Sequence, residues 1–292
     1  MRDFSQDHRW LSINTATIRK SLGVEQALEL IFDQCARLGI KGVAPWRDQV
    51  ALMGLKKAAK HIKDLGLTVT GHVRGGLFTA VDQAGLDAAI ADNRLAIDEA
   101  CELNANCLVM VAGSLPGALA GKAAHRNIGL ARNQVHDGLA QLFDYAKSNN
   151  MPLAIEPLHP MYAADRSCIN TLGQALDVCD AIDPHQTGMI GVAIDAYHVW
   201  WDPALQAQIK RAGKKRILAY HVCDWLTPTT DMLNDRGMMG DGIIDLKQLR
   251  QWVESEGYDQ YSEVEIFSAE NWWEKESIET LKVCIERHKS VV

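Results

Sequence analysis

The stretch GVAIDAYHVWWDPALQAQIKRAGKKRILAYHVCDW, residues 191–225, holds two short apolar runs with a longer segment between them. The runs, 191–195 and 217–223, have the length of buried strands, and the segment between them is long enough for a helix. A strand, a helix and a second strand in this order are typical of a parallel βαβ unit. This stretch therefore predicts a repeating unit that can be sought in the rest of the chain.

The same alternation extends over the whole chain. Short apolar runs recur at residues 11–15, 42–46, 68–73, 107–112, 152–156, 191–195, 217–223 and 261–266. Between them lie amphipathic patterns in which apolar residues recur every three and four positions, such as 24–39, 52–66 and 86–104. Eight strand–helix units favour an α/β fold that closes into a (β/α)8 TIM barrel, as a single domain over 1–292. An open doubly wound sheet is the alternative, but no GxGxxG motif follows the first run.

Residues typical of helix ends support these boundaries. Candidate C-terminal caps precede the following strand at Gly39, Gly66, Asn104 with Asn106, and Asn149 with Asn150. Asp245, in DGIIDLKQL, is expected to cap the N-terminus of the next helix. Residues 274–289 are expected to form a final helix. The loop 112–124 is rich in Gly, Ala and Ser and should lie over the barrel mouth, either as a lid or as a plain surface loop.

The composition limits the class of protein. Apolar residues make up 47% of the chain and the formal net charge is −7, which supports a large core and argues against nucleic acid as a partner. The seven cysteines form no CxxC pair, which predicts free thiols in a reducing compartment. The sequence has no signal-like N-terminus and no run long enough to span a bilayer. We expect a cytoplasmic protein that binds a small molecule and no membrane.

Four consecutive runs in the second half each carry an ionisable residue near the C-terminal end. They are Glu156 in LAIEPLHP, Asp195 in GVAIDAYH, His221 in LAYHVCDW and Glu265 in SEVEIFS. In a barrel of parallel strands these ends converge on one pocket. Because an unpaired buried charge is costly, such residues need a shared compensating partner. A divalent cation bound by three carboxylates and one imidazole would provide it.

The set of donor atoms indicates the kind of metal. Oxygen ligands with one nitrogen suit a hard or borderline ion, so Mn²⁺ is expected, with Mg²⁺, Co²⁺ or Zn²⁺ as alternatives. Glu263 shares a strand face with Glu265 but lies deeper, so Glu265 is the expected ligand and Glu263 is expected to pair with a basic residue. Cys223, on the same face as His221, is a minor alternative ligand. The residues two positions before three of the ligands are small and leave room for a substrate: Ala154, Ala193 and Ala219.

The order EP, DxxH, H and ExE at the last four runs resembles the xylose isomerase-like TIM-barrel sugar isomerases and epimerases. The segment HVCDWLTPTTDMLNDRGMMGDGIIDL, 221–246, is similar to that family's seventh strand and following loop. The family includes ketose 3-epimerases and inositol-catabolism isomerases. The resemblance implies that Glu156, Asp195, His221 and Glu265 are the metal ligands. It also implies that Glu156 and Glu265 are the catalytic acid–base pair and that His198 and Arg236 bind substrate oxygens.

Two departures from the family pattern leave the substrate open. The insertion WLTPTTDML lengthens the distance in sequence between His221 and Arg236, and His159 follows the EP pair where epimerases usually continue differently. We include His159 among the candidate substrate-binding residues. Trp46 is a further candidate because an aromatic face suits the CH-rich side of a sugar, and His72 is another because it lies near the end of the third run.

The expected activity is that of a metal-dependent sugar or sugar-phosphate isomerase or epimerase. A proton next to a carbonyl would be removed to give a metal-stabilised enediolate and then returned to the opposite face or to the neighbouring carbon. The same site could instead act as a lyase or dehydratase on an inosose or a 3-keto-glycoside, including C-glycoside cleavage. A barrel nuclease and a non-catalytic binding barrel are weaker alternatives. The partner is a small sugar or polyol, and assembly into a homo-oligomer is left open.

Overall fold

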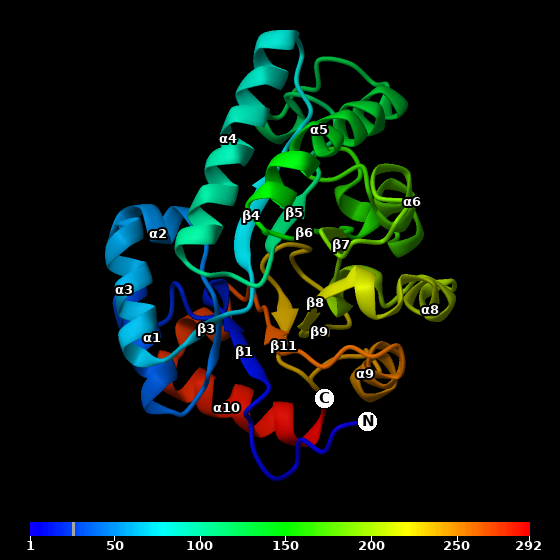
Figure 1. Cartoon of the computed structure of the whole chain (residues 1–292). Coiled ribbons are helices and arrows are strands. Elements are labelled where there is room, and N and C mark those ends of the chain that lie inside the picture. The colour runs from blue at the N-terminus through cyan, green and yellow to red at the C-terminus, as the bar shows by residue number, and fades with distance from the viewer. Residues whose placement is uncertain (25–26) are drawn as a thin grey trace.

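The computed structural model describes residues 1–24 and 27–292. Parallel strands form one sheet in the order β3-β2-β1-β11-β8-β7-β6-β5-β4. They lie at the centre of the molecule, with helices around them (Figure 1). Their bounds are β1 Leu11–Asn14, β2 Gly42–Ala44, β3 Thr68–Val69, β4 His72–Gly76, β5 Leu108–Val111, β6 Leu153–Ile155, β7 Ile190–Asp195, β8 Ile217–Val222 and β11 Ser262–Val264. The family fold expected from the sequence, a (β/α)8 TIM barrel, is confirmed.

The barrel closes through its third strand, which is divided in two. The expected strand 68–73 is present as β3, which pairs with β2, and β4, which pairs with β5. A single parallel bridge between Trp46 and Val73 joins the two sides. The two ends of the strand order are therefore two pieces of one run, and the sheet returns on itself.

Ten α-helices among the described residues connect these strands. They are α1 Leu28–Arg37, α2 Arg47–Met53, α3 Leu55–Leu65, α4 Gln83–Glu102, α5 Ile128–Ser148, α6 Leu172–Ile182, α7 Ala196–Val199, α8 Leu205–Arg216, α9 Leu246–Ser255 and α10 Ser277–Ser290. Short 3-10 turns are η1 Thr15–Thr17, η2 Ala118–Ala120, η3 Pro160–Tyr162 and η4 Trp272–Glu274. No helix in 1–24 or 27–292 is both long and apolar enough to cross a membrane.

Helix ends follow the local signals in the sequence, with two differences. The pattern 24–39 becomes helical only from Leu28, and residues 25 and 26 of that prediction lie outside the described residues. The pattern 52–66 is divided at Gly54, whose positive φ of 91° ends α2 and precedes α3. The Asp245 side chain accepts a hydrogen bond from the Gln248 amide and caps α9, as expected. Positive φ angles occur at several of the expected C-terminal caps: Gly39, Gly66, Asn104 and Asn150.

Buried apolar residues form three clusters, and two of them build the core of the barrel. The larger one lies between the strands and the surrounding helices. The smaller one fills the barrel interior with mostly small side chains, namely Ala44, Val73, Cys107, Val109, Ala154, Ala193 and Ala219. Side chains alternate along a strand, so Val192 and Ile194 of β7 face the helices while Ala193 and Asp195 face inward. The three alanines predicted below the site therefore do leave space above them.

A small antiparallel hairpin extends the chain after β8. Its strands are β9 Asp224–Trp225 and β10 Arg236–Gly237, and Arg236 pairs with Trp225. Asp224 holds the base of this hairpin, because its carboxylate accepts hydrogen bonds from the amides of Trp225, Gly240 and Ile244 at 2.9–3.0 Å. The insertion that separates His221 from Arg236 in sequence is thus a loop between β9 and β10, and its Leu233 lies on the wall of the cavity at the barrel mouth. It returns Arg236 to the barrel mouth.

Candidate active site

The structure brings together the four side chains that the sequence nominates as metal ligands. Glu156 follows β6, Asp195 ends β7, His221 lies in β8 and Glu265 follows β11, and these four strands are neighbours in the sheet. One ligand atom from each residue lies within 4.8 Å of the others, and all four side chains are buried. Ligand atoms about 2.1 Å from one ion lie at most roughly 4.2 Å apart, so small side-chain shifts would let all four bind a common cation.

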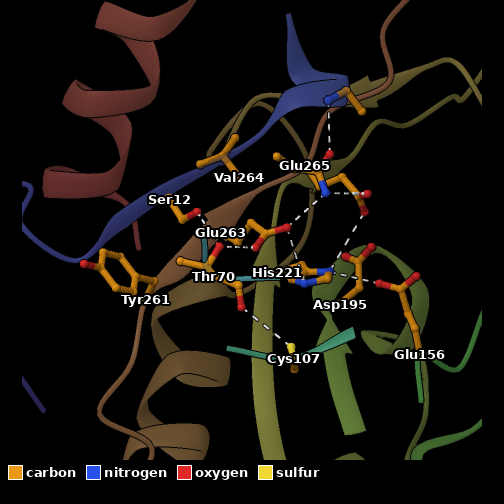
Figure 2. Close-up of polar contacts among 12 residues, drawn as sticks. Ser12, Thr70, Cys107, Glu156, Asp195, His221, Tyr261, Glu263, Val264 and Glu265 are labelled. Carbon is orange, nitrogen blue, oxygen red and sulfur yellow. Dashed lines mark hydrogen bonds and ion pairs between the residues drawn. The ribbon is translucent and has the colours of Figure 1, made fainter. Parts of the chain in front are cut away.

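The histidine of this cluster is held between two carboxylates. Nδ1 of His221 lies 2.9 Å from Oε1 of Glu156, and Nε2 lies 3.6 Å from Oε1 of Glu263 (Figure 2). Glu263 also accepts hydrogen bonds from the Asn14 amide at 2.9 Å and the Thr70 hydroxyl at 2.7 Å. Glu263 therefore forms an ion pair with His221 deeper in the barrel, although at 3.6 Å the two groups are too far apart for a hydrogen bond.

The charges of the cluster favour a cation. Burial opposes protonation of His221, but Glu263, Glu156 and Glu265 outweigh it and raise its pKa well above the usual value. Burial, reinforced by Glu156 and Asp195, raises the pKa of Glu265 to about 8 although Arg236 opposes this shift. Carboxylates outnumber the basic groups here, and a divalent ion would offset the excess of negative charge. The donor set and the charge therefore both fit a bound metal.

Arg236 is the basic residue at the top of the cluster. Its Nη1 lies 3.0 Å from Oδ2 of Asp195 and 3.1 Å from Oε2 of Glu265. Its guanidinium lies over the rings of Tyr197 and Phe267, at 4.5 and 5.1 Å from their centroids. Burial opposes ionisation of Asp195, but Arg236 outweighs it and lowers the pKa of that carboxyl. The structure thus pairs Arg236 with two of the candidate metal ligands.

His198 lies beside this pair. Its Nε2 is 3.1 Å from Nη2 of Arg236 and 3.6 Å from Oδ2 of Asp195, and its Nδ1 faces the His159 amide at 3.2 Å. Burial lowers the pKa of His198 to about 3, so the ring is neutral at physiological pH. Because Nδ1 accepts from the His159 amide, the neutral ring carries its proton on Nε2, which is the nitrogen that a substrate oxygen would meet.

A cavity opens above the cluster. Its volume is about 210 Å³, which lies below the roughly 300–1,000 Å³ of sites for drug-sized ligands and suits a small molecule. Polar and charged side chains on its wall are Glu156, Glu265, His198, Arg236, Arg74 and Arg166. Aromatic and aliphatic side chains form the rest, namely Trp46, Val73, Leu77, Val111, Leu119, Leu158, Tyr162, Leu233 and Phe267. The sequence-nominated residues Trp46, His198 and Arg236 therefore all face the cavity.

Two nominated substrate binders, His72 and His159, do not lie on the wall of this cavity. The buried ring of His72 faces outward, with Nδ1 at 3.0 Å from the Pro45 carbonyl and Nε2 at 3.4 Å from Glu99 on α4. His159 stacks on Trp225 with ring centroids 4.8 Å apart and does not line the cavity. Strand alternation turns His72 outward, and the aromatic cluster beside the hairpin holds His159.

The sequence reasoning missed one residue at the centre of the site. Asn14, at the end of β1, donates from Nδ2 to Glu263 at 2.9 Å and to Glu265 at 3.0 Å. Its Oδ1 accepts a hydrogen bond from the Trp46 indole at 2.7 Å. The available signal was a polar amide at the end of the first apolar run. It carries no charge, and so it was less conspicuous than the four ionisable residues.

Comparison with known proteins identifies the family. The model of the xylose isomerase-like TIM barrel family matches residues 32–285, and the chain belongs to that family. An inosose isomerase of Bacillus velezensis is 24% identical over 97% of this chain and 96% of its own length. A crystal structure of a Sinorhizobium meliloti 1021 protein is 54% identical, covers 97% of this chain and 98% of that chain, and has a TM-score of 0.89.

A further solved structure shares the fold at lower identity. The IolI protein, crystallised with a zinc atom, is 19% identical, covers 97% of each chain and has a TM-score of 0.77. At that identity the likeness concerns the fold alone. The curated relatives that match this chain are enzymes, each an inosose isomerase.

Proposed function

We propose that this member of the xylose isomerase-like TIM barrel family is a divalent-metal-dependent isomerase or epimerase of a sugar or sugar phosphate. The reaction would begin with removal of a proton next to a carbonyl and pass through an enediolate. The observation that carries the proposal is the placement of Glu156 and Glu265, which both line the cavity and both belong to the four-residue cluster. Two carboxylates beside one substrate pocket provide an acid and a base.

The strand order supports this pair for proton transfer. Glu156 follows β6 and Glu265 follows β11, while β7 and β8 lie between them in the sheet. A substrate bound between these strands would have one carboxylate on each side, which is the arrangement that lets a proton leave one face and return to another.

The metal would be held by Glu156, Asp195, His221 and Glu265. A bound divalent cation would act as a Lewis acid on the substrate carbonyl. Three carboxylates and one imidazole favour Mn²⁺, and the zinc in the IolI structure makes Zn²⁺ the first alternative to test. His198 and Arg236, which line the same cavity, would hold substrate oxygens and align the reacting carbon.

The relatives narrow the substrates to try first. An inosose is a cyclic polyol ketone, so the name of the Bacillus velezensis relative suggests a ketone flanked by hydroxyl-bearing carbons. The cavity has apolar walls beside a polar base, which suits a ring with one CH-rich face. We propose inososes, ketohexoses and their phosphorylated or acidic derivatives as the first substrates to test.

Isotope exchange tests the proposal. The purified chain with Mn²⁺ is incubated with an inosose or a ketohexose in D₂O, and deuterium next to the carbonyl is followed by NMR. Exchange is expected in the wild type. It should fall by about 10²–10⁴-fold in Glu156→Gln and Glu265→Gln. Glu99→Gln, which changes a partly buried carboxylate on α4 away from the cavity, is the matched control and should keep the wild-type rate.

Metal content is measured for each variant, so that lost metal can be separated from lost proton transfer. Full exchange by both glutamine variants would overturn the acid–base assignment. Loss of water or of the sugar skeleton, in place of exchange, would favour the lyase or dehydratase alternative, because both reactions begin with the same proton removal.

A further inference from the structure

Two arginines on the cavity wall have no part in the proposed proton transfer. Arg74 lies in β4 and Arg166 lies in the segment between η3 and α6. The side chain of Arg166 is 35% exposed, whereas those of Glu156 and Glu265 are 7% and 5% exposed. Arg74 is also only partly buried. Both arginines therefore lie in the outer part of the cavity, on the solvent side of the carboxylate cluster.

A β-bulge directs Arg74 toward the cavity. The parallel register between β4 and β5 pairs Val73 with Val109 and then Gly75 with Met110, so Arg74 is an extra residue in its strand. A bulge of this kind re-aims one side chain without ending the strand, and such bulges are common beside active sites. The bulge thus turns the Arg74 guanidinium toward the cavity, which regular alternation of side chains along β4 would not do.

The second arginine is held by a fixed segment. The Arg166 amide donates to the Tyr162 carbonyl at 3.1 Å, and its guanidinium carbon lies 5.4 Å from the centre of the Tyr162 ring. The Cys168 amide donates to the Gly113 carbonyl at 2.9 Å, which ties this segment to the loop 112–124. Arg166 is therefore positioned by contacts with a cavity-lining tyrosine and with the loop above the barrel.

Neighbouring arginines are neutralised by carboxylates, but this pair is not. Arg47 binds both Asp92 and Glu99, at 2.9 and 2.6 Å. Among the residues that the structure describes, Arg74 has no carboxylate within 4.0 Å, and Arg166 has only the adjacent Asp165 at that limit. Nε of Arg166 is buried without a hydrogen-bond partner in the same set.

The two guanidinium groups also repel each other. Burial, and then the charges of Arg166 and Arg47, lower the pKa of Arg74. Asp48 and Asp92 oppose this shift but do not contact Arg74, and an anion between the two guanidinium groups would relieve the cost of placing like charges at one cavity. Arginine suits this task because its planar donors match the oxygens of a carboxylate or a phosphate.

We propose that Arg74 and Arg166 form an anion subsite, and that the substrate is therefore an acidic sugar derivative with a carboxylate or phosphate distant from the reacting carbonyl. The inference rests on the proposed function for the position of the carbonyl. It adds that the anionic group is held in the outer cavity while the carbonyl lies over Glu156 and Glu265. Apolar walls between the two regions would contact the carbon chain.

Binding, measured without turnover, tests the subsite. Calorimetry compares gluconate, glucose 6-phosphate and glucose on the purified chain, both with Mn²⁺ and with EDTA. Both acidic probes, or one of them, should bind at least about 10-fold more tightly than glucose under both conditions. The tighter acid identifies the anionic group as carboxylate or phosphate. Persistence in EDTA would separate the subsite from direct binding of the acid to metal.

Charge-neutral variants locate the effect. Arg74→Gln and Arg166→Gln are each expected to weaken binding of the preferred acid by about 10-fold or more and to leave glucose binding unchanged. Arg211→Gln is the control, because it removes the same charge from an exposed residue that pairs with Asp177 and Asp180. It should change neither the affinity for the preferred acid nor the affinity for glucose. Unfolding curves are recorded for each variant, and Arg74→Lys should retain part of the acid preference because it keeps the charge.

The outcomes separate this inference from the proposed function. Equal affinity for acidic and neutral probes, or an acid preference that survives both arginine substitutions, would overturn the anion subsite even if deuterium exchange succeeds. An arginine-dependent acid preference without exchange of any substrate proton would support the subsite and count against the isomerase assignment alone.

Discussion

Glu263 and Glu265 lie two positions apart on one strand face, yet they have different surroundings. Glu265 reaches the cavity and Arg236, whereas Glu263 lies below it and contacts Asn14, Thr70 and Nε2 of His221. A carboxylate behind a ligating histidine fixes the ring and makes it a stronger donor. Two glutamates that look equivalent in sequence are thus a candidate ligand and the residue that positions another ligand.

This difference predicts the effect of Glu263→Gln. The amide keeps the size of the side chain but removes the charge beside His221, so affinity for Mn²⁺ should fall by about 10–100-fold. Calorimetric titration of the metal-free chain measures this change. Glu99→Gln, which alters another carboxylate near a histidine but outside the site, should leave affinity unchanged. Wild-type affinity in Glu263→Gln would show that Glu263 only fills space.

Among the secondary-structure elements, β4 shows why some features escape sequence analysis. The run TVTGHV predicts one strand, but the chain changes partner at residues 70–71, where the Thr70 hydroxyl bonds to Glu263 at 2.7 Å. The following bulge depends on how β4 meets β5. Neither the change of partner nor the bulge follows from apolar periodicity, because both depend on the register of a neighbouring strand. The place of Arg74 near the end of the run indicates a position close to the pocket, but the bulge that turns its side chain into the cavity does not follow from the pattern.

Gly76, the last residue of β4, lies very close to the backbone of β5, and a substitution at this position tests that packing. Gly76 has a φ of 106°, and a Cβ there would lie 1.9 Å from the Val111 carbonyl oxygen. Gly76→Ala should lower the free energy of unfolding by about 3 kcal/mol through strain and overpacking. Gly121→Ala is the control, since Gly121 has a φ of 89° but no atom within 4 Å, and it should cost only about 1 kcal/mol. Urea denaturation of both variants gives the comparison, and equal losses would refute the steric argument.

A buried histidine in the final helix, α10, predicts that the stability of the protein depends on pH. His288 is fully buried, its ring stacks on Phe4 with centroids 4.4 Å apart, and neither nitrogen has a hydrogen-bond partner within 1–24 or 27–292. Burial, followed by Arg250 and His8, lowers the pKa of His288 to about 3. Below the ordinary histidine pKa of about 6.5, His288 is protonated in the unfolded chain but stays neutral in the folded chain. The free energy of unfolding therefore falls as pH drops from 6.5 toward 3.

At pH 5 this linkage amounts to about 2 kcal/mol. Unfolding free energies at pH 7.5 and pH 5 should therefore differ less in His288→Phe than in the wild type, by about that amount. Replacement of the exposed His136 with Gln should keep the wild-type difference. An unchanged difference in His288→Phe would mean that His288 is protonated in the folded protein.

For the molecule as a whole, sequence analysis located the barrel and the strands that carry the cluster. Eight apolar runs and the ionisable residues at the ends of four of them suffice for that, since parallel strands bring their C-terminal ends to one edge. The pairing of Arg236 with Asp195 and Glu265 was not predictable, because it depends on the path of the hairpin that follows β8. The side to which His72 and His159 face was not predictable for another reason, since residues near a strand end can face either side.

The cluster joins strands β6, β7, β8 and β11, and metal binding should therefore affect the stability of the entire barrel. Folded carboxylates that crowd one another gain from a cation, while the unfolded chain holds them apart and binds the ion weakly. Mn²⁺ at 100 times its dissociation constant adds about 2.7 kcal/mol, which corresponds to a rise of about 5 °C in Tm for a chain of this size. Calorimetric scans with Mn²⁺ and with EDTA measure the shift.

Asp195→Asn should abolish most of the shift in Tm and Glu99→Gln should retain it, because only Asp195 belongs to the cluster. A Tm that does not respond to any of Mn²⁺, Zn²⁺, Mg²⁺ or Co²⁺ would mean that Arg236 and His221 alone balance these carboxylates, and the metal-dependent mechanism would have to be abandoned.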